Sequence, residues 1–178
     1  MTTKKELSCA CGAFALELTG APFIATECHC KSCNEAGRRL EALGLSGPML
    51  DAQGGTPFVL YRKDRVRFLR GAEHLAEFRL APDRPTRRII TTCCKTPVCV
   101  EFKGGHWLSL YPALWPEGEA PKPTIRTMVG DRGDSAPLPD DLPYGKLVTA
   151  GFFAKLLGEW IAMGFKSPDV RVERKIEA

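Results

Sequence analysis

The middle of the chain is a series of short apolar runs separated by turn-forming residues. Glycine, proline and Lys-Asp pairs mark the turns, and no run in this series is long enough for a helix. Short strands that follow one another without helices between them favour an antiparallel β fold over a nucleotide-binding α/β fold. The predicted strands are residues 57–61, 65–69, 75–80, 87–92, 98–102 and 107–111.

Further elements are predicted before and after this series. Residues 13–18 and 23–27 flank the turn Gly20-Ala21-Pro22, and we expect them to pair as a hairpin with one group of cysteines at each end. The remaining elements are a short helix over residues 35–43, a strand over residues 124–129, and an alternating tail over residues 170–176 that is a strand or a frayed end.

The last long element is a helix over residues 146–165 that is apolar around most of its circumference. Lys155, Glu159 and three glycines argue against a membrane span. We expect this helix to dock on the sheet or to form a homodimer contact. The proline-rich stretch before it, residues 112–143, is too long for a simple connector and is typical of a binding loop or a mobile segment.

Composition narrows the class of protein. The chain has 178 residues, 44% of them hydrophobic, which is enough for an ordinary core. Its net charge of +4 is spread along the chain without an aromatic-lined basic stripe, so we expect no nucleic-acid partner. No apolar segment of a signal peptide follows the polar start, so we expect a cytoplasmic protein. In a reducing cytosol, eight clustered cysteines indicate metal or thiol chemistry rather than disulfides.

The cysteines fall into three groups. Cys28, Cys30 and Cys33 form a C-x-C-x-x-C run, and several soft thiolates in one turn favour Zn²⁺. In the second group, Cys9-x-Cys11 is followed by Gly12, which suits the tight turn of a metal knuckle. The third group is Cys93, Cys94 and Cys99, at the end of a predicted strand. Seven or eight thiols exceed one four-coordinate site, so two zinc ions are expected.

The order of these groups resembles the glutathione-dependent formaldehyde-activating enzyme family, which includes centromere protein V-like domains. The resemblance rests on Cys9-x-Cys11-Gly12, on Cys28-His29-Cys30-x-x-Cys33, and on Cys94-Lys95-Thr96-Pro97 after a strand. Phe58-Val59-Leu60 and the segment from Phe68-Leu69-Arg70-Gly71 to Phe78 extend it, so that it covers about residues 6–130.

The resemblance implies a mainly β, β-tent type fold of antiparallel sheets held by zinc, with the C-terminal helix added. From the chain length we expect one zinc-binding domain over residues 1–178, with its core at about 6–130. A closed structural zinc would be held by Cys9, Cys11 and Cys94, and an open zinc by Cys28, Cys30 and Cys33. In the family, the open position takes the sulfur of glutathione. The implied activity is that of a zinc-dependent carbon–sulfur lyase acting on a small-thiol adduct of an aldehyde such as formaldehyde.

The chain departs from the family pattern at the late cysteine pair. Thr91 stands where the family has the first cysteine, and Cys93 comes directly before Cys94. Adjacent residues of a strand point in opposite directions, so both thiols reach one ion only through a local bend. We favour Cys93 as the fourth structural ligand. Cys99 or another residue is the alternative, and Cys99 could instead be a plain buried hydrophobe.

Other residues are candidates for supporting roles. Arg38, Arg39, Arg87 and Arg88 could hold the carboxylates of glutathione, although most such arginines are solvated surface charges. His29 is a fourth ligand, a proton shuttle or a spacer that points away from the metal. We expect His74 and His106 to be ordinary surface or core histidines.

Two alternatives to an enzyme remain. One is a non-catalytic, zinc-stabilised binding module that uses the proline-rich loop or the C-terminal helix. The other is a redox or metal-sensing protein that uses Cys30 and Cys33.

Overall fold

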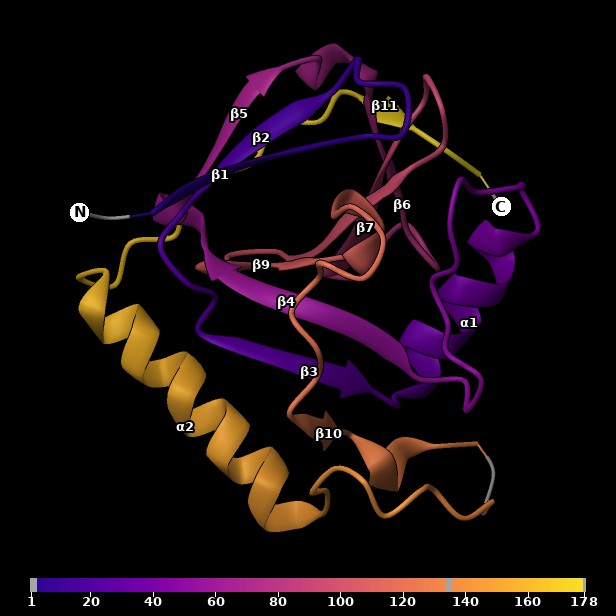
Figure 1. Ribbon diagram of the computed structural model, residues 1–178, viewed down its shortest axis with the longest axis vertical. Coiled ribbons are helices and arrows are strands. Elements are labelled where there is room, and N and C mark those ends of the chain that lie inside the picture. Colours follow the sequence, from indigo (N-terminus) through magenta and orange to yellow (C-terminus); the bar gives the residue numbers. More distant parts are fainter. Residues whose placement is uncertain (1–2, 134–135, 178) are drawn as a thin grey trace.

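A computed structural model describes residues 3–133 and 136–177 (Figure 1). Two β-sheets make up most of it, and a long helix follows near the C-terminus. Most strand pairs are antiparallel; the exceptions among the described strands are two parallel pairs at the two ends of the larger sheet. The prediction of a mainly β fold with a C-terminal helix is therefore confirmed.

The smaller sheet has three antiparallel strands in the order β1-β2-β5. Its first strand was not predicted, because Leu7 is its one fully buried residue and charged side chains fill most of the rest. Cross-strand ion pairs from Lys4 and Arg67 to Glu17 occupy its outer face. The strands are β1 (Lys4–Ser8), β2 (Ala15–Thr19) and β5 (Val66–Arg70).

The larger sheet has eight strands in the order β10-β3-β4-β9-β8-β7-β6-β11. Its central strands agree closely with the predicted series, because both of their faces are apolar and turn residues separate them. The strands are β3 (Ile24–Cys28), β4 (Thr56–Arg62), β6 (Leu75–Phe78), β7 (Thr86–Thr91), β8 (Pro97–Phe102), β9 (Trp107–Leu110), β10 (Ile125–Thr127) and β11 (Arg174–Lys175).

The predicted hairpin between residues 13–18 and 23–27 is wrong. β2 pairs with β1 and β5 in the small sheet, whereas β3 pairs with β4 and β10 in the large one. The segment after Gly20 carries the chain from one sheet to the other, and the Phe23 amide already donates a hydrogen bond to the Leu60 carbonyl. The cysteines before β2 and those after β3 therefore belong to different clusters.

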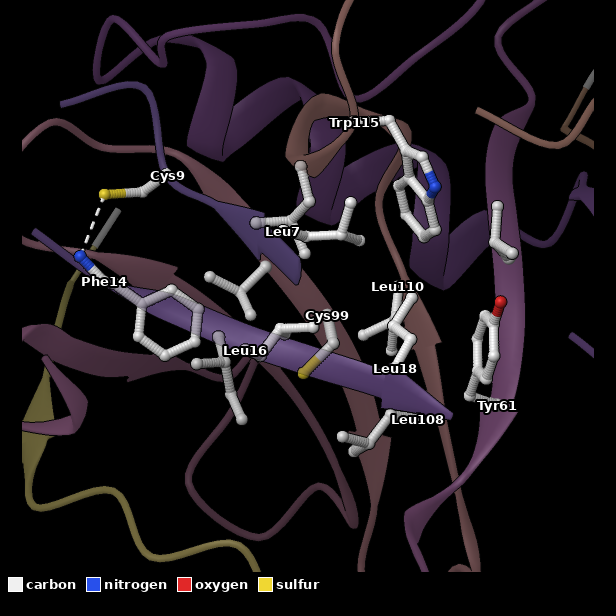
Figure 2. Close-up of a cluster of buried hydrophobic side chains, with 14 of the residues drawn as sticks. Leu7, Cys9, Phe14, Leu16, Leu18, Tyr61, Cys99, Leu108, Leu110 and Trp115 are labelled. Atoms are coloured by element: carbon white, nitrogen blue, oxygen red, sulfur yellow. Dashed lines mark hydrogen bonds between the residues drawn. The ribbon is translucent and has the colours of Figure 1, made fainter. Parts of the chain in front are cut away.

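Two hydrophobic clusters cover the two faces of the large sheet. Along β4, Val59 and Tyr61 face one cluster, and Phe58 and Leu60 face the other, because successive side chains of a strand alternate. The first cluster fills the space under the small sheet, where Phe14 of the loop before β2 lies near Leu7, Leu16 and Cys99 (Figure 2).

The helices cover the second cluster. α1 (Lys31–Glu41) begins four residues before the predicted start at residue 35 and buries Ala36 and Leu40. α2 (Lys146–Ala162) packs beside β10 and buries Leu156 (Figure 1). Four 3₁₀ turns complete the fold: Lys63–Arg65, Ala72–His74, Pro112–Leu114 and Val129–Asp131.

The long helix does dock on the sheet, but much of its apolar surface stays exposed. Trp160 stacks on His106 at a ring separation of 6.0 Å. In the described part of the chain, no helix combines the length and the hydrophobicity that crossing a bilayer requires. The large apolar side chains that are exposed on this helix are Leu147, Phe153, Leu157 and Ile161.

Gly71 allows a close backbone approach between the end of β5 and the loop before β2. It has a φ of +72°, and a Cβ there would lie 2.2 Å from the Ala13 carbonyl oxygen. We expect Gly71→Ala to destabilise the fold by about 1 kcal/mol for the left-handed backbone and roughly 1–3 kcal/mol more for the clash. Urea unfolding measures the change.

Gly118→Ala is the matched control, because Gly118 has a φ of +77° with no atom within 4 Å of the added Cβ. It should cost only about 1 kcal/mol. Equal losses of unfolding free energy in the two variants would contradict the close approach.

Candidate metal centres

Four cysteines from distant parts of the chain meet at the junction of the two sheets. In this four-cysteine cluster (Cys9, Cys11, Cys93, Cys94), all four sulfurs lie within 4.8 Å of one another. Cys9 Sγ lies 3.6 Å from Cys11 Sγ and 3.8 Å from Cys93 Sγ. Sulfurs bound to one tetrahedral ion at about 2.3 Å are about 3.8 Å apart, so the cluster could hold a metal ion. These separations are far longer than a disulfide bond.

The first half of the cluster is a knuckle that follows β1. Gly12 has a φ of +76°, and its amide donates a hydrogen bond to the Cys9 carbonyl at 2.9 Å. This tight turn directs the Phe14 amide at Cys9 Sγ, 3.3 Å away (Figure 2). An N–H that donates to sulfur stabilises the thiolate, which is the form that binds metal.

The second half is the turn between β7 and β8. Lys95 adopts a φ of +53°, and Thr91 and Thr96 close the turn through two hydrogen bonds of 2.9 and 3.0 Å. The adjacent Cys93 and Cys94 therefore lie on a bend rather than along a strand, and both reach the same cluster. This is the local bend that two neighbouring ligands require.

A buried hydroxyl links the two halves. Thr96 Oγ1 accepts a hydrogen bond from the Ala10 amide at 3.0 Å and lies 3.1 Å from Cys94 Sγ. Although burial raises the pKa of Cys94, hydrogen bonds from Thr91 and Thr96 and from the Cys11 backbone lower it overall. Thr96 was not predicted as a functional residue, although it lies two positions after Cys94 in the late cysteine motif.

Cys99 lies outside both cysteine clusters. Its side chain is fully buried in the core under the small sheet (Figure 2). Burial raises the pKa of this thiol, which keeps it protonated and unsuited to bind metal.

The three-cysteine cluster (Cys28, Cys30, Cys33) forms where β3 leads into α1. Its sulfurs lie within 4.8 Å of one another, and each residue is half-buried. Cys30 is the N-cap of α1, and its sulfur accepts a hydrogen bond from the Cys33 amide at 3.3 Å. Among the residues that the structure describes, no fourth histidine, cysteine or carboxylate belongs to this group. The cluster could hold a metal ion with a position left for another ligand.

The surroundings favour a thiolate at Cys30. The pKa of Cys30 is lowered because the Cys28 and Cys33 thiols donate hydrogen bonds to it, and the charge of Arg88 acts in the same direction. The positive end of the α1 dipole adds to this effect. The hydrogen bond with Cys30 raises the pKa of Cys28, and hydrogen bonds with Cys28 and Cys30 raise the pKa of Cys33.

Arg88 is the cationic side chain most closely associated with this cluster. It is only 1% exposed, and its Nη2 donates hydrogen bonds to the Ser32 carbonyl and hydroxyl at 2.9 and 2.8 Å. Its Nη1 has no hydrogen-bond partner within the described ranges. Ser32 and Arg88 line a cleft of about 530 Å³ that Lys31 and Arg84 also border. Arg84 was not among the predicted arginines.

The other three predicted arginines lie elsewhere. Arg87 pairs with Glu77 at 2.7 Å and also with Glu101. Arg39 pairs with Glu35 one helical turn earlier, and Arg38 borders a different cleft. Of the four predicted arginines, Arg88 is the one that hydrogen-bonds to a residue within 28–33, and the role of holding a substrate carboxylate stays a prediction.

None of the three histidines belongs to either cysteine cluster. His29 is buried and forms a separate group with Glu27 and Asp51. His74 is at the surface near Glu73, and His106 is packed between Trp107 and Trp160. Burial lowers the pKa of His106, which agrees with a core histidine.

Comparison with known proteins gives a family match and distant similarity to solved structures. A protein family described as "Family of unknown function (DUF6151)" matches residues 1–111. A solved Rhodobacter sphaeroides protein, a structural genomics target, is 19% identical with a TM-score of 0.45, over 66% of this chain and 92% of that chain. Similarity at that level carries no argument about function. No curated protein matches the chain.

Thr96→Val tests the link between the two halves of the four-cysteine cluster. Valine leaves the Ala10 amide unpaired and removes a hydrogen-bond donor to Cys94, so we expect at least about 10-fold weaker metal binding. Competition with a chromophoric chelator measures the metal affinity. The measurement uses protein that also carries Cys30→Ser, so that the three-cysteine cluster does not contribute to the signal.

Thr92→Val is the control, because the exposed Thr92 hydroxyl bonds the His74 carbonyl and no cysteine. Unchanged affinity in Thr96→Val, or an equal loss in Thr92→Val, would show that the buried hydroxyl does not support the cluster.

Proposed function

The chain belongs to the family of unknown function DUF6151, and from that premise we propose that it is a two-zinc enzyme with carbon–sulfur lyase-like chemistry. One observation carries the proposal: one cysteine cluster has four thiols and the other has three. Four thiolates fill the tetrahedral coordination of a zinc ion and make a closed structural site. Three thiolates leave one coordination position for a substrate.

The donor chemistry supports zinc as the metal. All seven donors are thiols, which are soft ligands, and tetrahedral sulfur coordination is typical of Zn²⁺ and of iron–sulfur centres. The backbone amides that face Cys9 and Cys30 are those expected around zinc-bound thiolates. We assign Cys9, Cys11, Cys93 and Cys94 to the structural zinc and Cys28, Cys30 and Cys33 to the open one.

We further propose a distant relationship to the glutathione-dependent formaldehyde-activating enzymes and centromere protein V-like domains. Two features support it: the order of the three cysteine groups, and a mainly β fold in which the first and last groups meet. The Cys93-Cys94 turn replaces the spaced pair of that family.

The proposed reaction joins the sulfur of a small thiol to the carbonyl carbon of an aldehyde, with the thiol proton going to the oxygen. The reverse reaction breaks that bond and releases both. When bound, zinc would supply a Lewis acid that favours the thiolate form of the substrate. Three thiolates leave the divalent ion with a net charge of about −1. Arg88 compensates this charge from its buried position.

The cleft beside the three-cysteine cluster suits an acidic thiol. Lys31, Arg84 and Arg88 border it, and only Glu35 and Asp131 oppose them in charge. A tripeptide thiol with two carboxylates, such as glutathione, fits a cleft of about 530 Å³ with three cationic neighbours.

The exposed face of α2 favours a second candidate function. Leu147, Phe153, Leu157 and Ile161 are between 51% and 89% exposed on one helix. A non-catalytic, zinc-stabilised module would use such a face to bind a second copy of the chain or another protein. In that case the three-cysteine cluster would hold metal without acting on a substrate.

Metal content separates a two-site protein from a one-site protein. We expect two zinc ions per chain in protein purified without added metal, and one in Cys30→Ser with the fold retained. Cys94→Ser should lose the structural ion and several kcal/mol of stability. Atomic absorption and circular dichroism measure both effects. A single ion that survives Cys30→Ser but not Cys94→Ser would leave only the binding module.

Glutathione binding separates the enzyme from the module. We expect calorimetry to detect binding to the zinc-loaded chain, roughly 10-fold weaker in Arg84→Gln through loss of one charged hydrogen bond. Arg67→Gln, on the small sheet, is the control. A wild-type chain with two zinc ions that neither binds glutathione nor changes the rate at which it combines with formaldehyde would contradict the lyase proposal.

A further inference from the structure

A third group of metal-binding side chains lies next to the three-cysteine cluster but shares no residue with it. One donor atom from each of Glu27, His29 and Asp51 lies within 4.8 Å of the other two. Glu27 Oε2 is 3.5 Å from His29 Nε2. The group combines one imidazole with two carboxylates, a donor set unlike that of the thiol clusters.

Strand alternation explains why two different groups form at one strand end. β3 runs through Cys28, the His29 amide bonds the Thr127 carbonyl of the neighbouring β10, and Cys30 has an extended backbone. Successive side chains of an extended chain point to opposite sides. Glu27 and His29 therefore face one side, and Cys28 and Cys30 face the other. Asp51, from the loop before β4, completes the first group.

Two of the three side chains in this group have a buried polar atom without a hydrogen-bond partner among the described residues. His29 is 3% exposed, and its Nε2 has no hydrogen-bond partner among the described residues. The same holds for Asp51 Oδ2. Leaving one such group unpaired costs about 1–3 kcal/mol. Two such atoms, His29 Nε2 and Asp51 Oδ2, lie within 4.8 Å of each other, which indicates a ligand between them.

The positions of the two carboxylates are set by other bonds. Asp51 Oδ1 accepts hydrogen bonds from the Gln53 and Gly55 amides, both at 2.8 Å, which directs Oδ2 into the group. Glu27 Oε2 accepts one from Arg126 Nε at 2.7 Å. The donors are therefore held in place before any ligand arrives.

Gly55 permits the close packing around the group. A Cβ at this position would lie 2.6 Å from Asp51 Oδ2 and 2.9 Å from His29 Nε2. Any other residue would push both donors apart, so the approach of Asp51 to His29 requires glycine here.

The charges leave room for a cation. Glu27 and Asp51 contribute two negative charges, and Arg126, which also pairs with Asp141 at 2.7 Å, offsets one of them at most. His29 also borders a cleft of about 700 Å³, together with Asn34 and Gly54, which gives a path from solvent.

We propose that Glu27, His29 and Asp51 form a third metal site, for a divalent transition ion that prefers nitrogen and oxygen ligands. One imidazole and two carboxylates suit Mn²⁺, Fe²⁺ or Zn²⁺, and three protein ligands leave further positions open toward the cleft. The site is independent of the thiol clusters in both its residues and its donor chemistry.

Mn²⁺ is the probe, because it binds oxygen and nitrogen donors in preference to thiolates. Zinc-loaded protein of known metal content is titrated with Mn²⁺, and free Mn²⁺ is counted by electron paramagnetic resonance. We expect one Mn²⁺ per chain, with at least 10-fold weaker binding in Asp51→Asn. This variant keeps Oδ1 for the turn and replaces only the converging Oδ2. A third zinc that wild-type protein carries and Asp51→Asn lacks would equally support the site.

Glu35→Gln is the control, because Glu35 lines the same cleft but pairs with Arg39. It should bind Mn²⁺ as wild type does. His29→Gln gives a second test should Asp51→Asn lower the Tm. Absence of both Mn²⁺ and a third zinc in wild type would overturn the proposal. Equal binding by wild type, Asp51→Asn and His29→Gln would also overturn it.

Discussion

The packing of the two sheets depends on the meeting of four thiols at their junction. Cys9 and Cys11 follow β1 of the small sheet, and Cys93 and Cys94 occupy the turn after β7 of the large one. The Ala10–Thr96 hydrogen bond spans the same junction. The left-handed backbone at Gly12 and at Lys95 forms the two tight turns, and the four sulfurs on these turns lie within 4.8 Å of one another. The apolar core under the small sheet then fills the space that this junction encloses.

Much of the fold could be predicted from the sequence because its strands are short, apolar and separated by clear turns. The prediction failed where the outcome depended on distant partners. The predicted hairpin was wrong because β2 pairs with β5, which lies about fifty residues further along the chain, and not with β3. β1 was missed because only Leu7 marks it as a buried strand. The grouping of Cys93 with Cys9 agrees with the favoured alternative, while the cleft-lining Arg84 could not be separated from other arginines without the tertiary structure.

The end of β3 places two kinds of chemistry back to back. Cys28 and Cys30 offer soft thiolates on one side, and Glu27 and His29 offer harder donors on the other. The sequence contained this signal in the alternation of Glu-Cys-His-Cys, but Asp51 and Arg126 join only through the fold. The thiol side of this strand end also has a buried cation beside it. The charge of Arg88 helps to lower the pKa of Cys30 and so favours the thiolate.

The two cysteine clusters differ in the length of chain that a bound metal would close. The three-cysteine cluster spans residues 28–33, so an unfolded chain can already present its thiols together. Cys9 and Cys93 are 84 positions apart, and closing such a loop removes roughly 4–5 kcal/mol of entropy from the unfolded chain. Metal that also binds the unfolded chain adds little to stability, whereas metal that requires the fold adds all of its binding free energy. A metal ion lost from the four-cysteine cluster would therefore cost the fold stability, whereas an ion lost from the three-cysteine cluster would cost it little.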